Sequence, residues 1–319
     1  MRTAFDSSRR SFLRTAGLLS GTALLLRHAP AGALEAFQAN SPDGMRNQMG
    51  AAPIETLKLT ERLLMLSGPG GNVIVFHGPD GKVVVDGFVK PAWPKLKAAL
   101  AAIDGAPIKS MIDTHWHFDH ADNNANFRAE GAGVIAHENT RKRLMEPHDL
   151  LGMRFEPVPQ AALPTQTFAA GLKLNVNGEQ VDLRYVPPAH TDTDIFVHFP
   201  KADVLHMGDL FFNGMYPFFD ATTGGNIDGM IAAAGTALKM VTARTKIVPG
   251  HGPLATRGSL EAYRTMLAAV RDRVQTEKKA GKSLAEVKAA KPSAAFDASW
   301  GKGMMGPDDF VALVYNTLR

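Results

Sequence analysis

Residues 113–124, "DTHWHFDHADNN", place three histidines and two interior acids in one short stretch. His115 and His117 are two residues apart, so both side chains can point to the same side of an extended segment. Asp119 and His120 follow where the chain must turn away, and they can face a second point in space. Zinc and similar divalent metals prefer neutral imidazole and carboxylate ligands. The cluster therefore indicates a metal site, although a histidine-rich surface loop can also arise by chance or bind metal weakly.

Three further residues of ligand type stand where an expected strand ends and a loop begins. His190 ends "VPPAH", Asp209 ends "VLHMGD" and His251 ends "IVPGH". Folds that combine helices and strands collect their chemistry at such positions, and the neighbouring glycines and prolines favour tight turns. Together with the cluster, these residues provide five histidines and two aspartates. That number is enough for two metals with an open position between them.

The chain contains no cysteine. This absence excludes every thiolate nucleophile and every thiolate metal ligand. Any metal must therefore be held by imidazole and carboxylate. A chain without thiols is also indifferent to an oxidising compartment.

The net charge does not indicate a nucleic-acid partner. Residues 1–33 carry five arginines and one aspartate, which account for the whole formal charge of +4. The remainder is near neutral, so it offers no basic face that could follow a phosphate backbone. Binding of DNA or RNA is not expected.

The N-terminal residues predict an export signal. An arginine pair, Arg9 and Arg10, precedes "SFL" and an apolar run over residues 16–26. That run is too short to span a bilayer, which requires about 20 residues. Residues 31–33, "AGA", match an A-x-A cleavage site after Ala33. The arrangement resembles a twin-arginine signal, which implies the twin-arginine export machinery as a partner during biogenesis and a periplasmic location. The alternative is an uncleaved, basic amphipathic anchor.

The rest of the chain divides into three expected regions. Residues 34–55 are polar and without clear periodicity, which predicts a linker, and residues 56–257 alternate strand-like and helical patterns. Two strand-rich halves, each with its helices, indicate an α+β fold in which two sheets pack together under outer helices. Residues 258–319 predict C-terminal helices that pack on this domain, beginning with an amphipathic helix over 260–279. These helices could also pair subunits, so the sequence sets no oligomeric state. No later segment is apolar enough for stable membrane insertion.

On these residues the chain resembles the metallo-β-lactamase superfamily, over roughly residues 57–253. The resemblance implies an αββα sandwich of two mixed sheets flanked by helices, with the site at one edge between the sheets. It also implies two zinc ions and the ligand set of the glyoxalase II and lactonase branches. In that set one zinc is bound by His115, His117 and His190, the other by Asp119, His120 and His251, and Asp209 bridges the two.

Two more residues are expected to support these ligands without binding metal. Asp86 closes the strand-like "KVVVD" and resembles the family's acid beside the cluster; the alternative is a simple turn residue before Gly87. His206 precedes Asp209 by three residues and is expected to have at most this outer role. The remaining histidines after the signal are expected to be structural: His77, His137, His148 and His198.

A pair of zinc ions predicts hydrolysis. Such a pair lowers the pKa of a bridging water from about 15.7 towards neutrality and polarises a carbonyl group. The bridging hydroxide can then attack an acyl carbon while Asp119 steers or accepts the proton. The expected substrate is a small acyl compound: an ester, lactone, thioester or amide.

Three other functions compete with this one. A β-lactamase fits the resemblance, but most true β-lactamases have cysteine or serine at the position of Asp209, and one branch has an anchoring lysine at the position of Phe212. A persulfide dioxygenase would use one Fe²⁺ on the equivalents of His115, His190 and Asp209 alone, leaving the remaining ligands without a purpose. The last alternative is a periplasmic zinc-binding protein without catalysis.

The segment after Asp209, "LFFNGMYPFFDATTGG", is aromatic and free of basic residues. Phe211, Phe212 and Phe218 therefore predict a pocket for an apolar or aromatic acyl group beside the metals. The alternative is that these rings only seal the edge of the sandwich.

Overall fold

The computed structural model describes residues 41–318, so the export signal expected over residues 1–33 lies outside the described residues. The chain divides into two units, residues 1–48 and 49–319. Helix α3 (Pro42–Gly50) lies within the expected linker, and the lack of periodicity there did not predict it. Its local signals are a proline at the first helical position and the Ser41 hydroxyl, which accepts a hydrogen bond from Gly44 N at 3.0 Å. Both features favour the start of a helix.

Seven strands form the first sheet, and it is mixed. Its first four strands pair antiparallel, and the others add in parallel because helices connect them. The expected single run over 57–67 is two strands, since Leu63 N donates to Thr60 Oγ1 at 3.1 Å and closes a turn. In sheet order the strands are β1 (Glu55–Lys58), β2 (Leu63–Gly68), β3 (Gly71–Phe76), β4 (Lys82–Val85), β5 (Ile108–Ile112), β6 (Gly133–His137) and β9 (Gln166–Phe168).

Five strands form the second sheet, in chain order and antiparallel except for the last pair. Asn177 and Gly178 form the turn of its first hairpin, and both have positive φ, 52° and 73°. An Asn-Gly pair favours this turn because both residues tolerate that conformation. The strands are β10 (Gly171–Val176), β11 (Glu179–Tyr185), β12 (Ile195–Phe199), β13 (Val204–His206) and β14 (Lys246–Val248).

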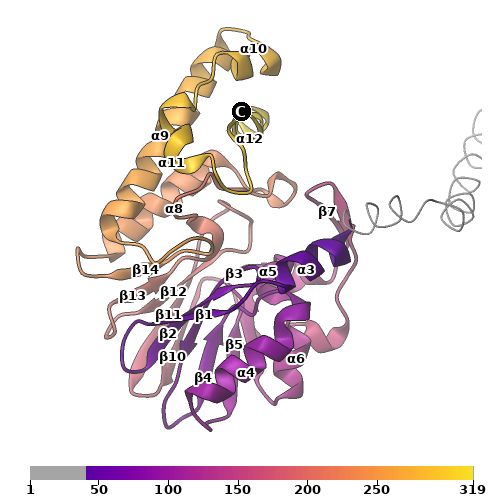
Figure 1. Ribbon diagram of the computed structural model, residues 1–319, viewed down its shortest axis with the longest axis vertical. Helices are drawn as coiled ribbons and strands as arrows, with labels where there is room; N and C mark the ends of the chain where they lie inside the picture. The colour runs from indigo at the N-terminus through magenta and orange to yellow at the C-terminus, as the bar shows by residue number, and fades with distance from the viewer. Residues whose placement is uncertain (1–40, 319) are drawn as a thin grey trace, which may run out of the picture. The chain divides into compact units, whose positions relative to one another are not determined.

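The two sheets pack face to face. In β12, Ile195 and Val197 join a buried cluster with Ile74 and Ile112 of the first sheet, whereas Phe196 lies in a separate cluster beneath helices. This division follows from the alternation of side chains along a strand. Helices α8 (Ile227–Met240) and α9 (Arg257–Lys279) cover the second sheet, and α4 (Trp93–Ile103), α6 (Asn124–Ala129) and α7 (Glu138–Leu144) flank the first (Figure 1). The αββα sandwich is confirmed.

The C-terminal residues form three short helices beside α9. They are α10 (Leu284–Ala289), α11 (Ala294–Trp300) and α12 (Pro307–Thr317). Phe310, Val314 and Leu318 are buried in the cluster beneath the helices, and Leu313 packs against it. None of the helices within residues 41–318 is both long and apolar enough to cross a membrane.

A short hairpin packs against the aromatic residues of the histidine cluster. Trp116 packs on His148 with ring centroids 4.5 Å apart, and Phe118 stacks on Phe155 at 5.1 Å. Both contacts are with a hairpin that the sequence did not predict, formed by β7 (His148–Leu150) and β8 (Met153–Phe155). The remaining short elements are α5 (Phe118–Ala121), η1 (Lys90–Ala92), η2 (Gln160–Ala162), η3 (Gly208–Leu210) and η4 (Ala221–Thr223).

Candidate metal centre

The seven predicted ligands lie on four segments, each of which follows a strand. The cluster follows β5, with Asp119 and His120 already inside α5. His190 lies between β11 and β12, Asp209 lies in η3 just after β13, and His251 follows β14. The structure brings all seven residues into two groups whose ligand atoms are mutually close.

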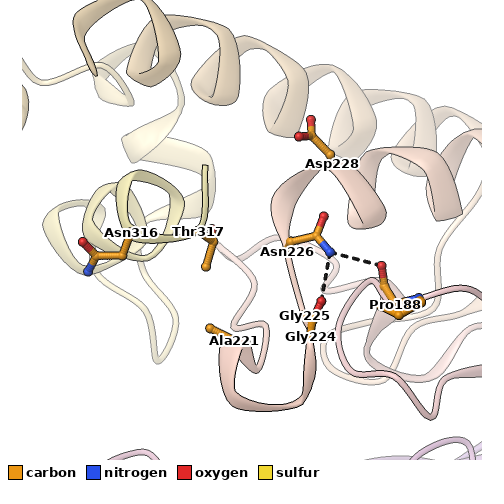
Figure 2. A pocket seen from close by; sticks show the side chains of 8 residues that line it. All are labelled: Pro188, Ala221, Gly224, Gly225, Asn226, Asp228, Asn316 and Thr317. Atoms are coloured by element: carbon orange, nitrogen blue, oxygen red, sulfur yellow. Dashed lines mark hydrogen bonds between the residues drawn. The ribbon is translucent and has the colours of Figure 1, made fainter. Parts of the chain in front are cut away.

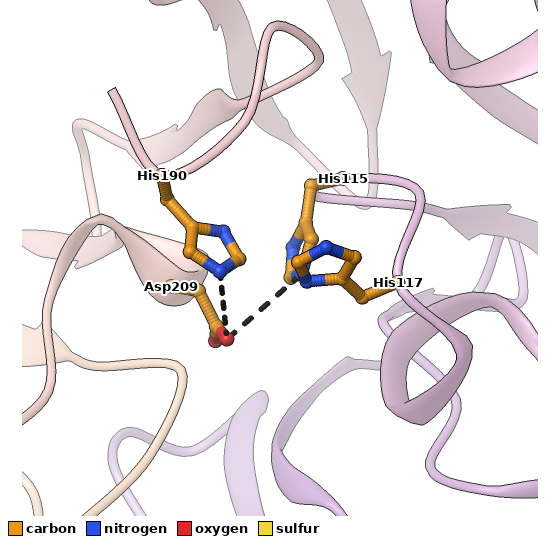
Figure 3. A group of neighbouring side chains, drawn as sticks. All are labelled: His115, His117, His190 and Asp209. Carbon is orange, nitrogen blue, oxygen red and sulfur yellow. Dashed lines mark ion pairs between the residues drawn. The ribbon is translucent and has the colours of Figure 1, made fainter. Parts of the chain in front are cut away.

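The first group contains His115, His117, His190 and Asp209, and all four are buried. Their ligand atoms lie within 4.8 Å of one another. Oδ2 of Asp209 lies 3.6 Å from Nε2 of His190 and 3.9 Å from Nε2 of His115. Figure 3 shows His115 and His117, which share the segment after β5, and His190, from a separate loop, around this carboxylate. The spacing suits one metal ion at their centre.

The second group contains Asp119, His120 and His251, whose ligand atoms are also within 4.8 Å of one another. Asp209 lies between the two groups. Its Oδ1 is 3.2 Å from Nε2 of His120, and its Oδ2 is 3.3 Å from Nε2 of His251. One carboxylate therefore approaches imidazoles of both groups, which is the geometry that a bridging ligand requires.

Many of the candidate metal-binding atoms have no other partner, which is consistent with a bound metal. Within residues 41–318, several buried atoms of these residues have no hydrogen-bond partner: Nε2 of His115 and His120, both ring nitrogens of His190, and Oδ1 of Asp209. A buried polar atom left without a partner costs about 1–3 kcal/mol, so such a concentration calls for a bound group. Imidazole and carboxylate suit a divalent cation. The clusters indicate a metal cofactor.

Outer hydrogen bonds orient two of the histidines. Asp86 accepts a hydrogen bond from Nδ1 of His120 at 2.8 Å. The same carboxylate accepts from the backbone N–H and the hydroxyl of Thr114, each at 2.8 Å. The Thr114 oxygen in turn lies 3.0 Å from Nδ1 of His115. Because these contacts occupy Nδ1, they leave Nε2 of both rings directed at the centre. Asp86 thus occupies the supporting position proposed from the sequence.

His206 supports the turn before Asp209 rather than a ligand. It is fully buried, and its Nδ1 accepts a hydrogen bond from Gly208 N at 3.0 Å. Asp194 stabilises the His190 loop in a similar way, since its carboxylate accepts from the backbone N–H groups of His190 and Thr191 at 2.9 and 2.8 Å. Both residues fix loop geometry.

Carboxylates dominate the electrostatics of the second group. Burial alone would lower the pKa of His120, but Asp209, Asp86 and Asp119 raise it well above its ordinary value. Burial is likewise outweighed at His251, whose pKa is raised to about 10 by Asp209 and Asp119. Burial would raise the pKa of Asp209, yet the imidazoles of His251 and His120 hold it well below its ordinary value. This charge distribution favours a bound cation.

The centre opens to solvent at the second group. The side chain of His251 is 21% exposed and that of Asp119 is 10% exposed, whereas that of Asp209 is 5% exposed. The glycine turn between β2 and β3 lies against this opening. A Cβ at Gly70, where φ is +107°, would lie 2.8 Å from the Cβ of Asp119. The sequence identified this turn only as a hairpin connection, and its glycine also allows close approach to the site.

The three phenylalanines of the predicted pocket divide between the site and the core. Phe212 stacks on His251, with centroids 5.1 Å apart and planes at 9°. The ring of Phe218 is partly exposed and lies 6.1 Å from the rings of both His117 and His190. Phe211 instead packs into the core beneath α9, and it does not line the site. The reason is that neighbouring side chains of an extended segment point to opposite sides.

The sequence did not predict Asp220 as part of this centre. It is buried, and its Oδ2 lies 3.6 Å from Nε2 of His117. Its carboxylate accepts hydrogen bonds from Thr222 N at 2.9 Å and from the Thr223 hydroxyl at 2.6 Å. The run "DATT" carries the local signal, because an aspartate followed by threonines favours a turn closed by its own side chain.

A separate cavity of about 600 Å³ lies beside the turn that follows Asp220. In Figure 2 the amide of Asn226 donates to the backbone oxygens of Pro188 and Gly224 at its wall. None of the seven ligands lines it. The lining residues are Pro188, Ala221, Gly224, Gly225, Asn226, Asp228, Asn316 and Thr317.

The family follows from a direct comparison. The model of the metallo-beta-lactamase superfamily matches residues 66–264, which is more than half of the chain. The chain belongs to this superfamily, whose members are mostly metallo-hydrolases.

Solved structures share the fold at low sequence identity. A metallo-beta-lactamase from Pontibacter korlensis is 19% identical, with a TM-score of 0.57, over 67% of this chain and 99% of that one. A stereoselective inverting sec-alkylsulfatase from Pseudomonas sp. is 14% identical, with a TM-score of 0.60, over 85% of this chain and 51% of that one. These similarities establish the fold alone.

One curated relative matches part of the chain. It is the 2,4-dinitroanisole O-demethylase subunit alpha of Nocardioides sp. (strain JS1661), 26% identical over 145 residues. The match covers 44% of this chain and 41% of the relative. The aligned part thus spans less than half of that protein.

Proposed function

We propose that this protein is a dinuclear zinc hydrolase of small, weakly charged acyl compounds. The observation that carries the proposal is the position of Asp209, whose two oxygens lie 3.2 Å from His120 Nε2 and 3.3 Å from His251 Nε2, with His190 Nε2 at 3.6 Å. A single metal would leave one of the two groups without a purpose. A full second group therefore favours two metals over the one Fe²⁺ of a dioxygenase.

The chain's own residues would divide the work. The first zinc would be held by His115, His117 and His190, the second by Asp119, His120 and His251, with Asp209 shared. When bound, such a pair polarises an acyl oxygen and acidifies water. Asp119 lies at the exposed end of the centre, 3.4 Å from His251 Nε2. Its carboxylate is therefore placed to orient water for attack and to accept its proton.

The surroundings support an uncharged, partly aromatic substrate. Phe218 presents a partly exposed ring beside His117 and His190, and the segment from Phe211 to Asp220 contains no lysine or arginine. This segment therefore offers no cationic anchor for a phosphate or a carboxylate. Lactones and aryl or alkyl esters fit best. The relative named for 2,4-dinitroanisole adds aryl ethers to the compounds worth testing.

Metal analysis and a substrate panel test the proposal. Protein exported in vivo should contain close to two zinc ions per chain, and it should hydrolyse an aryl ester or an acyl lactone faster than a thioester or a chromogenic cephalosporin. Dominant cephalosporin turnover would instead establish a β-lactamase. One iron with oxygen consumption would establish the dioxygenase, and zinc without turnover of any compound would leave only metal binding.

We also propose export to the periplasm by the twin-arginine route, on the strength of Arg9 and Arg10 in "SRRSFL". Replacing both arginines by lysine should retain the protein in the cytoplasm. Cell fractionation measures this, and continued export of the double variant would refute the route.

A further inference from the structure

Asp220 reaches the first metal group from behind His117. Its carboxylate Oδ2 lies 3.6 Å from Nε2 of His117, slightly beyond hydrogen-bond length. Both side chains are buried, with exposed fractions of 2% and 4%. A small rotation of the imidazole would bring the two atoms into a charge-assisted hydrogen bond. Such a bond to a carboxylate is stronger than one between two neutral groups.

The carboxylate is itself held firmly. Oδ1 accepts from the backbone N–H and the hydroxyl of Thr222, at 2.9 and 2.6 Å, and Oδ2 accepts from the hydroxyl of Thr223 at 2.6 Å. A side chain fixed by three donors can impose an orientation on its neighbour. These hydrogen bonds prevent rotation of the Asp220 carboxylate, so it can hold the His117 imidazole in one orientation.

The backbone of Asp220 engages a second histidine of the same group. Its N–H donates to the carbonyl oxygen of His190 at 2.7 Å, and its own carbonyl accepts from Gly225 N at 2.7 Å. The chain is packed so closely here that a Cβ at Gly225 would lie 2.3 Å from the His190 oxygen. One residue thus contacts His117 through its side chain and His190 through its backbone.

Two other buried histidines of the centre, His120 and His190, show the same arrangement. Nδ1 of His120 is 2.8 Å from Asp86, and Nδ1 of His190 is 3.4 Å from Asp194. In each case an acidic residue faces one ring nitrogen and leaves the other for the centre. Asp220 completes this pattern for His117, with the difference that it faces Nε2.

We propose that Asp220 is a positioning residue of the first metal subsite, which accepts a hydrogen bond from Nε2–H of His117, presents Nδ1 of that ring to the metal and fixes the His190 loop. The inference rests on the proposed metal centre and is independent of the substrate. Outer partners of this kind typically contribute about 10–100-fold to metal affinity.

Nuclear magnetic resonance of the zinc-loaded protein, labelled with ¹⁵N in histidine, tests the hydrogen bond. The His117 ring should carry its proton on Nε2. That proton should resonate downfield, because it is hydrogen-bonded to a carboxylate. In Asp220→Asn the proton should stay on Nε2 and its resonance should move upfield, because a neutral amide oxygen is a weaker acceptor. A proton on Nδ1 in the wild type would overturn the proposal, since Nε2 would then face the metal beside Asp220.

Zinc affinity gives the second measurement, by competition with a chelator. Asp220→Ala should bind the zinc of the first group about 10–100-fold less tightly than the wild type, and Asp220→Asn should fall between the two. Asp203→Asn is the matched control, because it alters a carboxylate that accepts from Thr245 at 2.5 Å outside the centre. Affinity equal to the wild type in Asp220→Ala would refute the role.

The outcomes separate this inference from the proposed function. A protein that binds zinc but hydrolyses nothing would refute the hydrolase and leave the His117 measurements intact. If Asp220→Ala does not fold, the near-isosteric Asp220→Asn still decides the question through the Nε2 proton. An unchanged resonance in that variant would overturn the proposal.

Discussion

The carboxylate of Asp86 lies 2.8 Å from Nδ1 of His120, and Asp86 adopts a positive φ of 65° to place it there. A non-glycine residue in this conformation is uncommon and indicates a local constraint. The conformation directs the side chain of a strand-end residue back to the metal centre. Asp86 therefore links the end of β4 to a ligand of the second metal group.

Asp86→Ala should weaken binding of the second metal by about 10–100-fold, because His120 loses the acceptor that fixes its ring. Asp86→Asn should lose less affinity for this metal, since its amide oxygen can still accept a hydrogen bond from Nδ1–H of His120. Zinc competition with a chelator measures both variants. If Asp86→Ala retains two zinc ions with wild-type affinity, the orientation of His120 does not depend on this contact.

Removal of a ligand should differ sharply from removal of His206. His115→Ala, His190→Ala and Asp209→Ala should each abolish turnover, because each takes a donor from the centre. His206→Ala should reduce kcat/KM by about 10–100-fold at most, since the hydrogen bonds of His206 go to the backbone of Gly208 and Asn72. Kinetics of each purified variant, with zinc content measured in parallel, provide the comparison. Equal loss at His206 would show that the ligands are wrongly assigned.

The two groups of candidate ligands could be predicted because their chemistry is visible in single residues. The histidine cluster and the residues ending "VPPAH", "VLHMGD" and "IVPGH" combine metal-binding side chains with turn formers at strand ends. Fold class could be predicted for a related reason, since alternation along β11 and the apolar face of α9 repeat with the period of their element. Both kinds of signal are local.

What the sequence could not predict depends on where a loop closes in space. Asp220 follows Asp209 by eleven residues of irregular chain, and nothing local shows that this loop returns to His117. The different positions of Phe211 and Phe212 depend on the register of a two-residue extended segment, which has no period to detect. The turn that splits residues 57–67 depends on the hydroxyl of a single threonine, Thr60.

A histidine outside the centre should contribute to the pH dependence of stability. His137 is buried, its Nδ1 accepts from Asn139 N at 3.2 Å, and its Nε2–H donates to the Ala169 oxygen at 2.7 Å. The contact with Asn139 requires an unprotonated Nδ1 and therefore a neutral ring. Burial accordingly lowers the pKa of His137 below its ordinary value.

The sign of the effect follows from linkage. The unfolded chain, with a histidine pKa of about 6.5, takes up the proton first as the pH falls. The stabilising contribution is therefore present above about pH 6.5 and is lost as the pH falls towards the folded pKa. His137→Asn keeps an acceptor for Asn139 N but cannot titrate, so it should lose less stability than the wild type between about pH 7.5 and about pH 5.5. Urea denaturation at both pH values measures this; equal losses would contradict it.

Gly250 leaves room for the carboxylate of Asp209. A Cβ at this position would lie 1.9 Å from Oδ1 of Asp209, a distance that no relaxed structure allows. Gly250→Ala should therefore displace Asp209 and reduce the bound zinc. Gly258→Ala is the matched control, because it lies in α9 with its nearest contact at 3.7 Å, where alanine is favoured over glycine by about 1 kcal/mol. Zinc content and melting temperature of both variants test the contrast; full zinc content in Gly250→Ala would refute it.

Phe218 and Phe211 should separate substrate binding from stability. Phe218 is partly exposed beside His117 and His190, so Phe218→Ala should raise KM for an aryl ester more than for a short alkyl ester while leaving unfolding nearly unchanged. Phe211 is fully buried, with its ring 4.9 Å from that of Tyr263, so Phe211→Ala should cost about 3–5 kcal/mol of stability and leave the ratio of the two KM values unchanged. Steady-state kinetics with both esters and urea denaturation measure the two effects. Unchanged aryl selectivity in Phe218→Ala would mean that the ring only seals the edge of the sandwich, and that the acyl group binds against other residues around Asp119 and His251.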